Sequence, residues 1–185
     1  MINSMCFTGH RPKELFGYDE SARPKYSELT QEILKIIRGL YDDGCRTFIS
    51  GGAQGVDQIA FWAVEHLKKE HPDVKNVLYA PFKNQESSWK EKGMFGQAEY
   101  RKMLKAADKV SYVFESRRSN YMLMVRNHIM VNDSDVVLAI YGRPEDFRTI
   151  EKGSGTAECM QYAYKNNKDI IILNPFTHLY RRIST

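Results

Sequence analysis

Short apolar runs alternate with longer amphipathic segments along the chain. Strands that are buried on both faces are apolar at odd and even positions alike, because successive side chains point to opposite faces. Most of the short runs show this pattern, over residues 1–7, 46–50, 74–80, 109–114, 135–141 and 169–173. The segments between them space their apolar residues at helical intervals, over residues 24–41, 56–69, 97–107, 120–131 and 156–165.

Strands that alternate with helices predict an α/β fold with a parallel sheet. We expect a Rossmann-like three-layer sandwich, in which a mostly parallel sheet of about six strands carries helices on both faces. The length of 185 residues suits one domain, here residues 1–176, and we expect residues 177–185 to form a C-terminal tail. In such sheets ligands bind beyond the carboxyl ends of the strands, so the loops that follow the strands are the candidate sites.

Composition narrows the class of protein. Three cysteines without a C-x-x-C pair argue against a disulfide scaffold or a zinc ribbon. No apolar run approaches the length of about 18 residues that a membrane span needs, and the first residues lack the features of a signal peptide. We therefore expect a cytoplasmic protein with no membrane partner. The net charge of +4 is spread in mixed signs, which suits a solvated surface and favours an anionic ligand only slightly.

The most informative loop is glycine-rich and lies between a predicted strand and a predicted helix. Glycines let the backbone approach an anion closely, and a helix N-terminus offers unpaired N–H groups to it. The loop therefore suits a phosphate, although a tight turn would use the same glycines. It lacks the Lys-Ser/Thr pair of a P-loop. The candidate ligand-binding residues here are Ser50, Gly51, Gly52, Ala53, Gln54, Gly55 and Asp57.

A second glycine loop also joins a strand to a helix. It can present N–H groups and a hydroxyl to a phosphate, and its alternative is a plain helix cap at Thr156 with flexible glycines before it. Two such loops at strand ends in one domain strengthen each other as candidates. The residues of this second loop are Gly153, Ser154, Gly155 and Thr156.

The loop after the first strand supplies Thr8, Gly9, His10 and Arg11. The planar guanidinium of Arg11 suits phosphate. His10 could bind, stack or transfer a proton, while a structural role is the commoner fate of a lone histidine. No H-E-x-x-H spacing occurs, so we predict no metal.

Two further sets complete the candidates. Arg126 and Asn127 lie in a predicted helix, where a surface salt bridge is the alternative to ligand binding. Pro81, Phe82 and Trp89 follow a strand, where the two aromatic rings could stack on a base or simply pack.

Several parts of the sequence resemble known families. Residues 49–57, I-S-G-G-A-Q-G-V-D, resemble the phosphate-binding stretch S-G-x-A-x-G-[IV]-D of DprA proteins. Residues 124–156 resemble the Lonely guy proteins, with Arg126, Met130 and Asp135 at matching offsets. Both families belong to the SLOG superfamily of Rossmann-like nucleotide binders. The chain resembles the YpsA family of this superfamily most, at Thr8-Gly9-His10-Arg11-Pro12, Ser50-Gly51, Gly55-Val56, Pro81-Phe82, Trp89, Ser134-Asp135 and Gly155-Thr156-Ala157-Glu158.

The resemblance implies a nucleotide or nucleotide-derived phosphate as ligand, bound without a further cofactor, with sensing as one use of such binding. The alternative is an enzyme. Lonely guy enzymes hydrolyse the N-glycosidic bond of nucleoside 5′-monophosphates with an Arg and a Glu beside the Gly-Thr loop. Arg126 matches the Arg, whereas Cys159 stands at the Glu position and Glu158 one place earlier, so Arg126 and Glu158 are the candidate catalytic pair.

A third reading is binding of single-stranded DNA, as in DprA. Such binders combine a basic groove with stacking aromatic side chains, and the mixed charge of this chain does not favour a nucleic-acid partner. The DprA and Lonely guy families both form dimers, so the resemblance implies a homo-oligomer.

Overall fold

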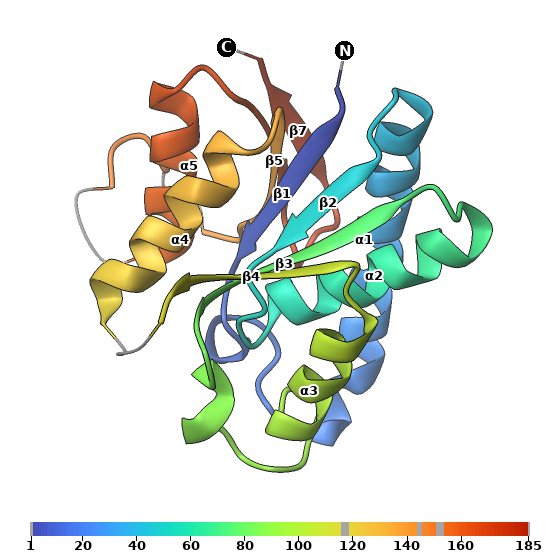
Figure 1. The fold of residues 1–185 in the computed structure, drawn as a ribbon. Helices are drawn as coiled ribbons and strands as arrows, with labels where there is room; N and C mark the ends of the chain where they lie inside the picture. Colours follow the sequence, from blue (N-terminus) through green and yellow to red (C-terminus); the bar gives the residue numbers. More distant parts are fainter. Residues whose placement is uncertain (1, 116–118, 144–145, 151–153, 185) are drawn as a thin grey trace.

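The computed structural model describes residues 2–115, 119–143, 146–150 and 154–184, and all statements below refer to these residues. They form one sheet flanked by helices (Figure 1). The strands are β1 (Ser4–Gly9), β2 (Thr47–Ser50), β3 (Lys75–Phe82), β4 (Lys109–Phe114), β5 (Val136–Ile140), β6 (Asp169–Leu173) and β7 (Tyr180–Ile183). The α-helices are α1 (Arg23–Asp42), α2 (Val56–Glu70), α3 (Gln97–Ala106), α4 (Asn120–Asn132) and α5 (Gly155–Lys165), and short 3-10 helices cover Pro12–Glu14, Glu20–Ala22 and Gln85–Ser88.

The sheet has the strand order β4-β3-β2-β1-β5-β6-β7. The first six strands are parallel, and β7 runs antiparallel to β6. The chain moves outward from β1 to β4 and then returns to place β5 on the other side of β1. This reversal opens a crevice beyond the carboxyl ends of β1 and β5, where open α/β sheets bind their ligands.

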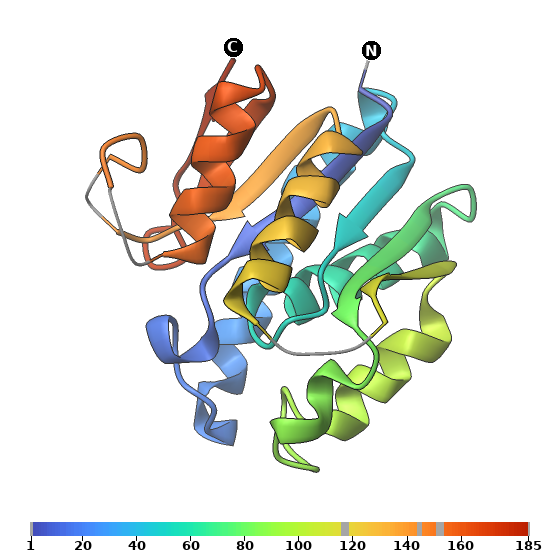
Figure 2. The same cartoon turned by 60° about the vertical axis from the view of Figure 1, so that its left-hand side comes forward.

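Helices cover the sheet in two layers. Figure 1 shows α1, α2 and α3 on one face and α4 and α5 on the other, and Figure 2 brings α4 and α5 forward. Alternate residues of β1 serve the two layers: Met5 and Phe7 pack with α1 and α2, whereas Cys6 packs with α4 and α5. This alternation is why the strands are apolar at both parities. The predicted α/β class and the three-layer arrangement are confirmed.

The C-terminal segment after residue 176, expected to form a tail, contributes one further strand to the sheet. Residues Tyr180–Ile183 form β7, whose Ile183 pairs with Ile170 and whose Tyr180 pairs with Leu173. The strand is short and lies at the edge of the sheet, so its Y-R-R-I sequence needs no apolar residues on both faces. The sheet therefore has seven strands in place of the six that the apolar runs predict.

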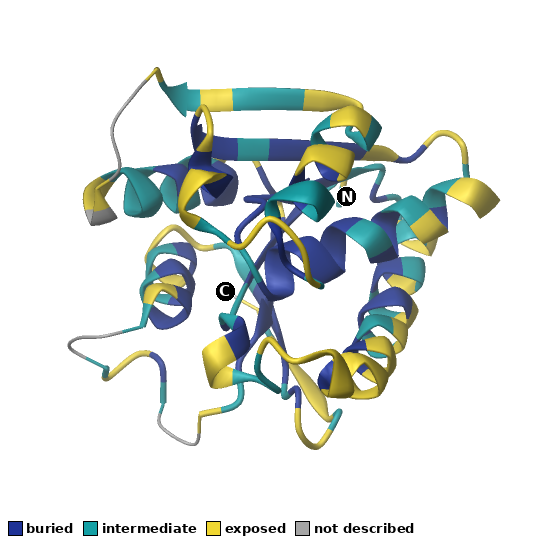
Figure 3. Cartoon of the chain, turned by 90° about the horizontal axis from the view of Figure 1, so that it is seen from below, coloured by how far each residue is buried: buried dark blue, intermediate teal, exposed yellow. Residues whose placement is uncertain are grey.

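Burial follows the layers. Seen from the end at which the parallel strands finish, buried residues gather on the strands and on the inward helix faces, and exposed residues lie outside (Figure 3). Within the described part of the chain, no helix is long and apolar enough to cross a membrane.

Candidate functional site

A pocket of about 220 Å³ lies at the carboxyl edge of the sheet, beside the reversal between β1 and β5. Four segments that are distant in sequence meet there: the end of β1, the loop before α2, the middle of α4 and the start of α5. We call it the phosphate pocket, after the ligand that the glycine loop predicts. It is lined by Thr8, Gly9, Arg11, Glu14, Ala53, Gln54, Asp57, Leu123, Arg126, Asn127, Gly155 and Thr156.

The loop between β2 and α2 is shaped by its glycines. A Cβ on Gly51 would lie 1.4 Å from Nη1 of Arg126, so this arginine rests directly on the bare backbone of the loop. Gly55 has a φ of +95°, and a Cβ there would lie 2.7 Å from the carbonyl oxygen of His10. Any other residue at these positions would push the loop away from β1 and α4.

Arg126 is the buried cation of the site. Its side chain is 4% exposed and lies at the pocket wall. Nη1 donates to the carbonyl oxygen of Tyr79 at 3.4 Å and lies 3.5 Å from Oδ2 of Asp57. Nε is buried and has no hydrogen-bond partner among the described residues. A buried guanidinium with an unused donor is costly unless a further acceptor completes it.

Asp57 connects the glycine loop to Arg126. It lies in the first turn of α2, and its Oδ2 accepts a hydrogen bond from the backbone N–H of Ala53 at 3.1 Å. The same oxygen faces Arg126. One carboxylate thus holds the loop in place and compensates part of the buried positive charge.

Two helices point their N-termini at the pocket. Helix α2 begins at Val56 after the loop, and α5 begins at Gly155, which lines the pocket together with Thr156. The hydroxyl of Ser154 accepts from the N–H of Ala157 at 3.2 Å and caps α5. The positive ends of both helix dipoles therefore act on the same small volume, which favours an anion.

The loop after β1 adds one more cation and one carboxylate. Arg11 and Glu14 are three residues apart at the turn Pro12–Glu14, and both line the pocket. Glu14 accepts a hydrogen bond from Nη2 of Arg143. Burial raises the pKa of Glu14, but this bond and the neighbouring His10 lower it more, so its pKa lies below the usual range. Each pocket carboxylate is therefore held by an arginine, Asp57 by Arg126 and Glu14 by Arg143.

His10 does not line the pocket. It is 2% exposed, its Nε2 accepts from the N–H of Gly142 at 3.1 Å, and its ring stacks on Tyr141. Burial lowers the pKa of His10. Its place beneath the loop fits the structural reading of a lone histidine.

Glu158 also lies away from the pocket. Its Oε1 is 2.5 Å from Nε2 of His128 on α4, and the His128 ring stacks on Tyr162 at 3.7 Å between ring centroids. Cys159, at the position of the acid in the Lonely guy pattern, is buried, and burial raises the pKa of its thiol. Of the candidate catalytic pair, the structure brings Arg126 alone to the pocket wall.

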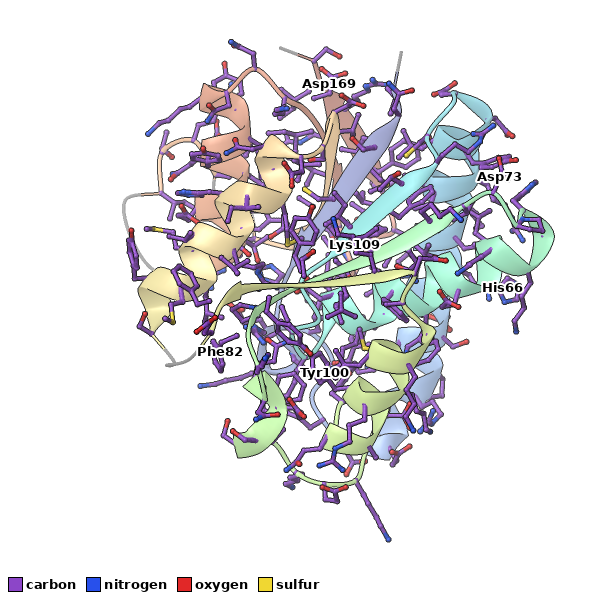
Figure 4. The ribbon with its side chains drawn as sticks, viewed as in Figure 1. His66, Asp73, Phe82, Tyr100, Lys109 and Asp169 are labelled. Atoms are coloured by element: carbon purple, nitrogen blue, oxygen red, sulfur yellow. The ribbon has the colours of Figure 1, made fainter. Side chains whose placement is uncertain are left out.

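The aromatic candidates separate from one another. Phe82 is buried at the end of β3, where it pairs with Phe114 of β4, and Figure 4 shows it at the lower edge of the sheet, opposite Asp169. Trp89 lines a second cavity together with Gln54, the one residue that both cavities share. Six further candidates belong to the surrounding backbone and do not line the phosphate pocket: Ser50, Gly51, Gly52, Gly55, Pro81 and Ser154. The candidate Gly153 lies outside the described residues.

Two residues that line the phosphate pocket, Leu123 and Glu14, were not predicted from the sequence. Leu123 precedes Arg126 by three positions and Asn127 by four, so all three share one face of α4. That spacing was a usable signal. Glu14 sits in a loop without periodicity, and only the fold shows that it turns toward β1.

Comparisons with known proteins agree with this architecture. A protein of Bacillus subtilis strain 168, the uncharacterized SPbeta prophage-derived protein YoqJ, is 32% identical over 155 residues, which cover 77% of this chain and 84% of that protein. A UPF0398 protein of Bacillus thuringiensis strain Al Hakam is 28% identical over 138 residues, which cover 74% and 73% of the two chains.

Among solved structures, the DNA processing protein A of Helicobacter pylori, described with its single-stranded DNA binding mode, matches with a TM-score of 0.55 and 18% identity. The match covers 92% of this chain and 65% of that one, and at this identity it shows the fold alone. The family model of YpsA, the YspA SLOG family, matches residues 5–178. The chain therefore belongs to the YpsA family of SLOG proteins.

Proposed function

We propose that the phosphate pocket binds the phosphate of a nucleotide or nucleotide derivative. The observation that carries the proposal is the buried Arg126, which rests on the bare backbone of Gly51 at the pocket wall, beside the N-termini of α2 and α5. Cation, backbone N–H groups and helix dipoles are the three means by which proteins hold phosphate. Arg11, which also lines the pocket, supplies a second cation.

The size of the pocket supports binding of part of a ligand. Its volume of about 220 Å³ lies below the roughly 300–1,000 Å³ of complete small-molecule sites. The phosphate and the sugar next to it would fill this volume, and the remainder of the ligand would extend beyond it. Such binding needs no metal and no catalytic group, which suits a sensor.

Calorimetric titration tests the proposal. The panel is inorganic phosphate, ribose 5-phosphate, nucleoside mono- and diphosphates, ADP-ribose and NAD. We expect at least one nucleotide to bind with a Kd in the micromolar range or below, and Arg126→Gln to weaken it by at least tenfold, or about 1.4 kcal/mol. The matched control is Arg38→Gln, which removes an exposed ion pair between α1 and Glu70 at the C-terminal end of α2 and should leave the Kd unchanged. A panel with no binder contradicts the proposal.

Hydrolysis of a nucleotide is the second candidate, favoured by Arg126 at the pocket wall. A glycosidase needs a carboxylate at the sugar, and Glu158 is engaged by His128 instead. The carboxylates that line the pocket, Asp57 and Glu14, are held by arginines. We therefore expect chromatography to detect no free base from nucleoside 5′-monophosphates at saturating binding. Base release that Arg126→Gln abolishes would establish the enzyme instead.

Single-stranded DNA is tested in the same series, because the fold neighbour from Helicobacter pylori binds it. Binding to a DNA backbone weakens steeply with salt. We expect the Kd of a mononucleotide to be lower than the Kd of an oligonucleotide when the oligonucleotide concentration is counted in nucleotide units. A salt-sensitive gel shift at nanomolar protein without mononucleotide binding would assign the pocket to DNA.

A further inference from the structure

A second cavity adjoins the phosphate pocket and differs from it in chemistry. It has a volume of about 300 Å³ and is walled by Tyr18, Trp89 and Phe95, with Gln54 on the side that it shares with the phosphate pocket. Lys90 and Lys92 are exposed at its rim. We call it the aromatic pocket. One cavity is thus lined by cations and helix N-termini, and its neighbour by aromatic rings.

Two walls of the aromatic pocket, Trp89 and Phe95, are held in place by their packing and hydrogen bonds. Trp89 packs edge to face on the buried Tyr100, with 5.4 Å between ring centroids. The backbone N–H of Trp89 donates to the carbonyl oxygen of Glu86 at 2.8 Å, and the carbonyl oxygen of Trp89 accepts from Nε2 of Gln97 at 2.9 Å. Phe95 packs edge to face on Tyr26 at 5.0 Å. Preorganised walls save the entropy of ordering side chains on binding.

Gln54 joins the two cavities. Its Nε2 donates to the carbonyl oxygen of Phe95 at 2.7 Å, which ties the glycine loop of the phosphate pocket to the wall of the aromatic pocket. The loop on that wall is itself closed by backbone hydrogen bonds from Gly96 to Gly93 and from Gln97 to Lys90. The two cavities therefore keep a fixed relation, as a ligand with two chemically different ends requires.

We propose that the aromatic pocket is the base subsite of the ligand whose phosphate occupies the phosphate pocket. A planar heteroaromatic ring stacks against Trp89, and the sugar spans Gln54. The inference rests on the proposed function and narrows it to nucleotides with an accessible base, excluding sugar phosphates and inorganic phosphate as the preferred ligands. Base stacking on an aromatic side chain is worth about 1–3 kcal/mol, so the base should dominate selectivity among phosphates.

The chain has two tryptophans, Trp62 and Trp89, which makes a direct test available. Trp62 lies on α2 beside Phe61 and does not line either cavity. Trp62→Phe therefore leaves Trp89 as the single fluorescent reporter without touching the pockets. We expect at least one of the common nucleoside 5′-monophosphates to quench Trp89 emission on titration. Ribose 5-phosphate should displace that nucleotide and reverse the quenching, while causing none itself.

Affinities supply the second measurement. Trp89→Leu should weaken the best-bound nucleotide by roughly 5- to 150-fold, the range that corresponds to the loss of one stacked base. It should leave the Kd of ribose 5-phosphate unchanged, and Trp89→Phe should restore most of the nucleotide affinity. Thermal unfolding of each variant shows whether the fold is kept, and the quenching experiment stands without any change in the aromatic pocket.

The outcomes separate the two proposals. Equal affinities for the nucleotide and ribose 5-phosphate, with no quenching of Trp89, overturn the base subsite and leave phosphate binding standing. Absence of binding by every phosphate overturns both. Quenching together with selective loss of nucleotide affinity in Trp89→Leu supports both.

Discussion

At the scale of single residues, the site depends on a contact that a methyl group would abolish. Arg126 lies where the Cβ of any residue at position 51 other than glycine would be. Its buried guanidinium faces Asp57 at 3.5 Å and keeps an unused Nε donor. Gly51 thus leaves space for the guanidinium of Arg126, whose Nε donor can still bind an acceptor.

Replacement of this glycine tests the contact. Gly51→Ala should displace Arg126 and weaken nucleotide binding at least tenfold, since the new Cβ would lie 1.4 Å from Nη1. Gly39→Ala in α1 is the matched control, because its Cβ meets open space, and it should stabilise the helix by about 0.5–1 kcal/mol. Calorimetry and thermal unfolding measure both. Full affinity in Gly51→Ala would show that Arg126 takes no part in binding.

His10 predicts a pH dependence of stability. Its folded pKa is lowered by burial, with Arg143 acting in the same direction and Glu14 against it. Below the unfolded pKa of about 6.5 the unfolded chain binds the proton more readily than the folded one. The contribution of His10 to the free energy of unfolding is therefore complete above that pH, and it is lost as the pH falls through the folded pKa of His10.

The measurement is the melting temperature between pH 7.5 and pH 5 for the wild type and His10→Gln, in which the glutamine oxygen can still accept from Gly142. The two proteins differ at position 10 alone, so the difference between their curves isolates His10. We expect a smaller loss of stability on acidification in the variant. Parallel curves would contradict the assignment of the shift to His10.

At the scale of elements, Asp135 shows how the strands are brought into register. Its carboxylate precedes β5 and accepts from the N–H groups of Asn3 at 2.7 Å and Ser4 at 3.0 Å, where β1 begins. Burial raises the pKa of Asp135, but these backbone bonds lower it more, and the net pKa is below the usual range. Asp135 thus acts at the amino edge of the sheet, opposite the site.

Removal of this carboxylate should affect stability alone. Asp135→Ala should lower the free energy of unfolding by about 1 kcal/mol, a modest value because the bonds are exposed. Urea unfolding measures the change, and calorimetry should show an unchanged nucleotide Kd. Weaker nucleotide binding at equal folding would mean that Asp135 acts on the site, as its match to the Lonely guy pattern would suggest.

The elements were predictable to different degrees. The runs at residues 109–114 and 169–173 give β4 and β6 with their observed bounds. Strand β6 is apolar along most of its length because it is buried inside the parallel part of the sheet. Strand β4 lies at the edge and is only partly buried, yet its valines and aromatic residues still mark it as a strand. The sequence of the edge strand β7 has no apolar run that would predict it, since Y-R-R-I meets solvent along most of its length. Its pairing with β6 depends on tertiary context that a local pattern does not contain.

At the scale of the whole molecule, strand order decides which candidates meet. The sequence indicates which loops follow strands, but not that β5 returns beside β1 and so brings the start of α5 to the loop before α2. Rotation along helices decides the rest. Arg126 and Thr156 reach the pocket, while Glu158 turns to His128, because side-chain direction on a helix changes with every position. Trp89 lies beyond Gln54, which only the fold could show.

Homo-oligomer formation and a cytoplasmic location stay predictions at this scale. Size-exclusion chromatography with multi-angle light scattering on the purified chain tests the first: a particle of twice the chain mass of 21.5 kDa supports a dimer. A single species at the chain mass at micromolar concentration would contradict it.

The central claim is that one crevice at the reversal between β1 and β5 holds the phosphate of a nucleotide. A crystal structure of the chain with its best-bound nucleoside 5′-monophosphate tests this most directly. We expect the phosphate within hydrogen-bonding distance of Arg126 and the N-terminus of α2 or α5, with the base against Trp89. A nucleotide seated elsewhere, for example between Arg143 and Arg181 beside β7, with the phosphate pocket empty, would contradict it.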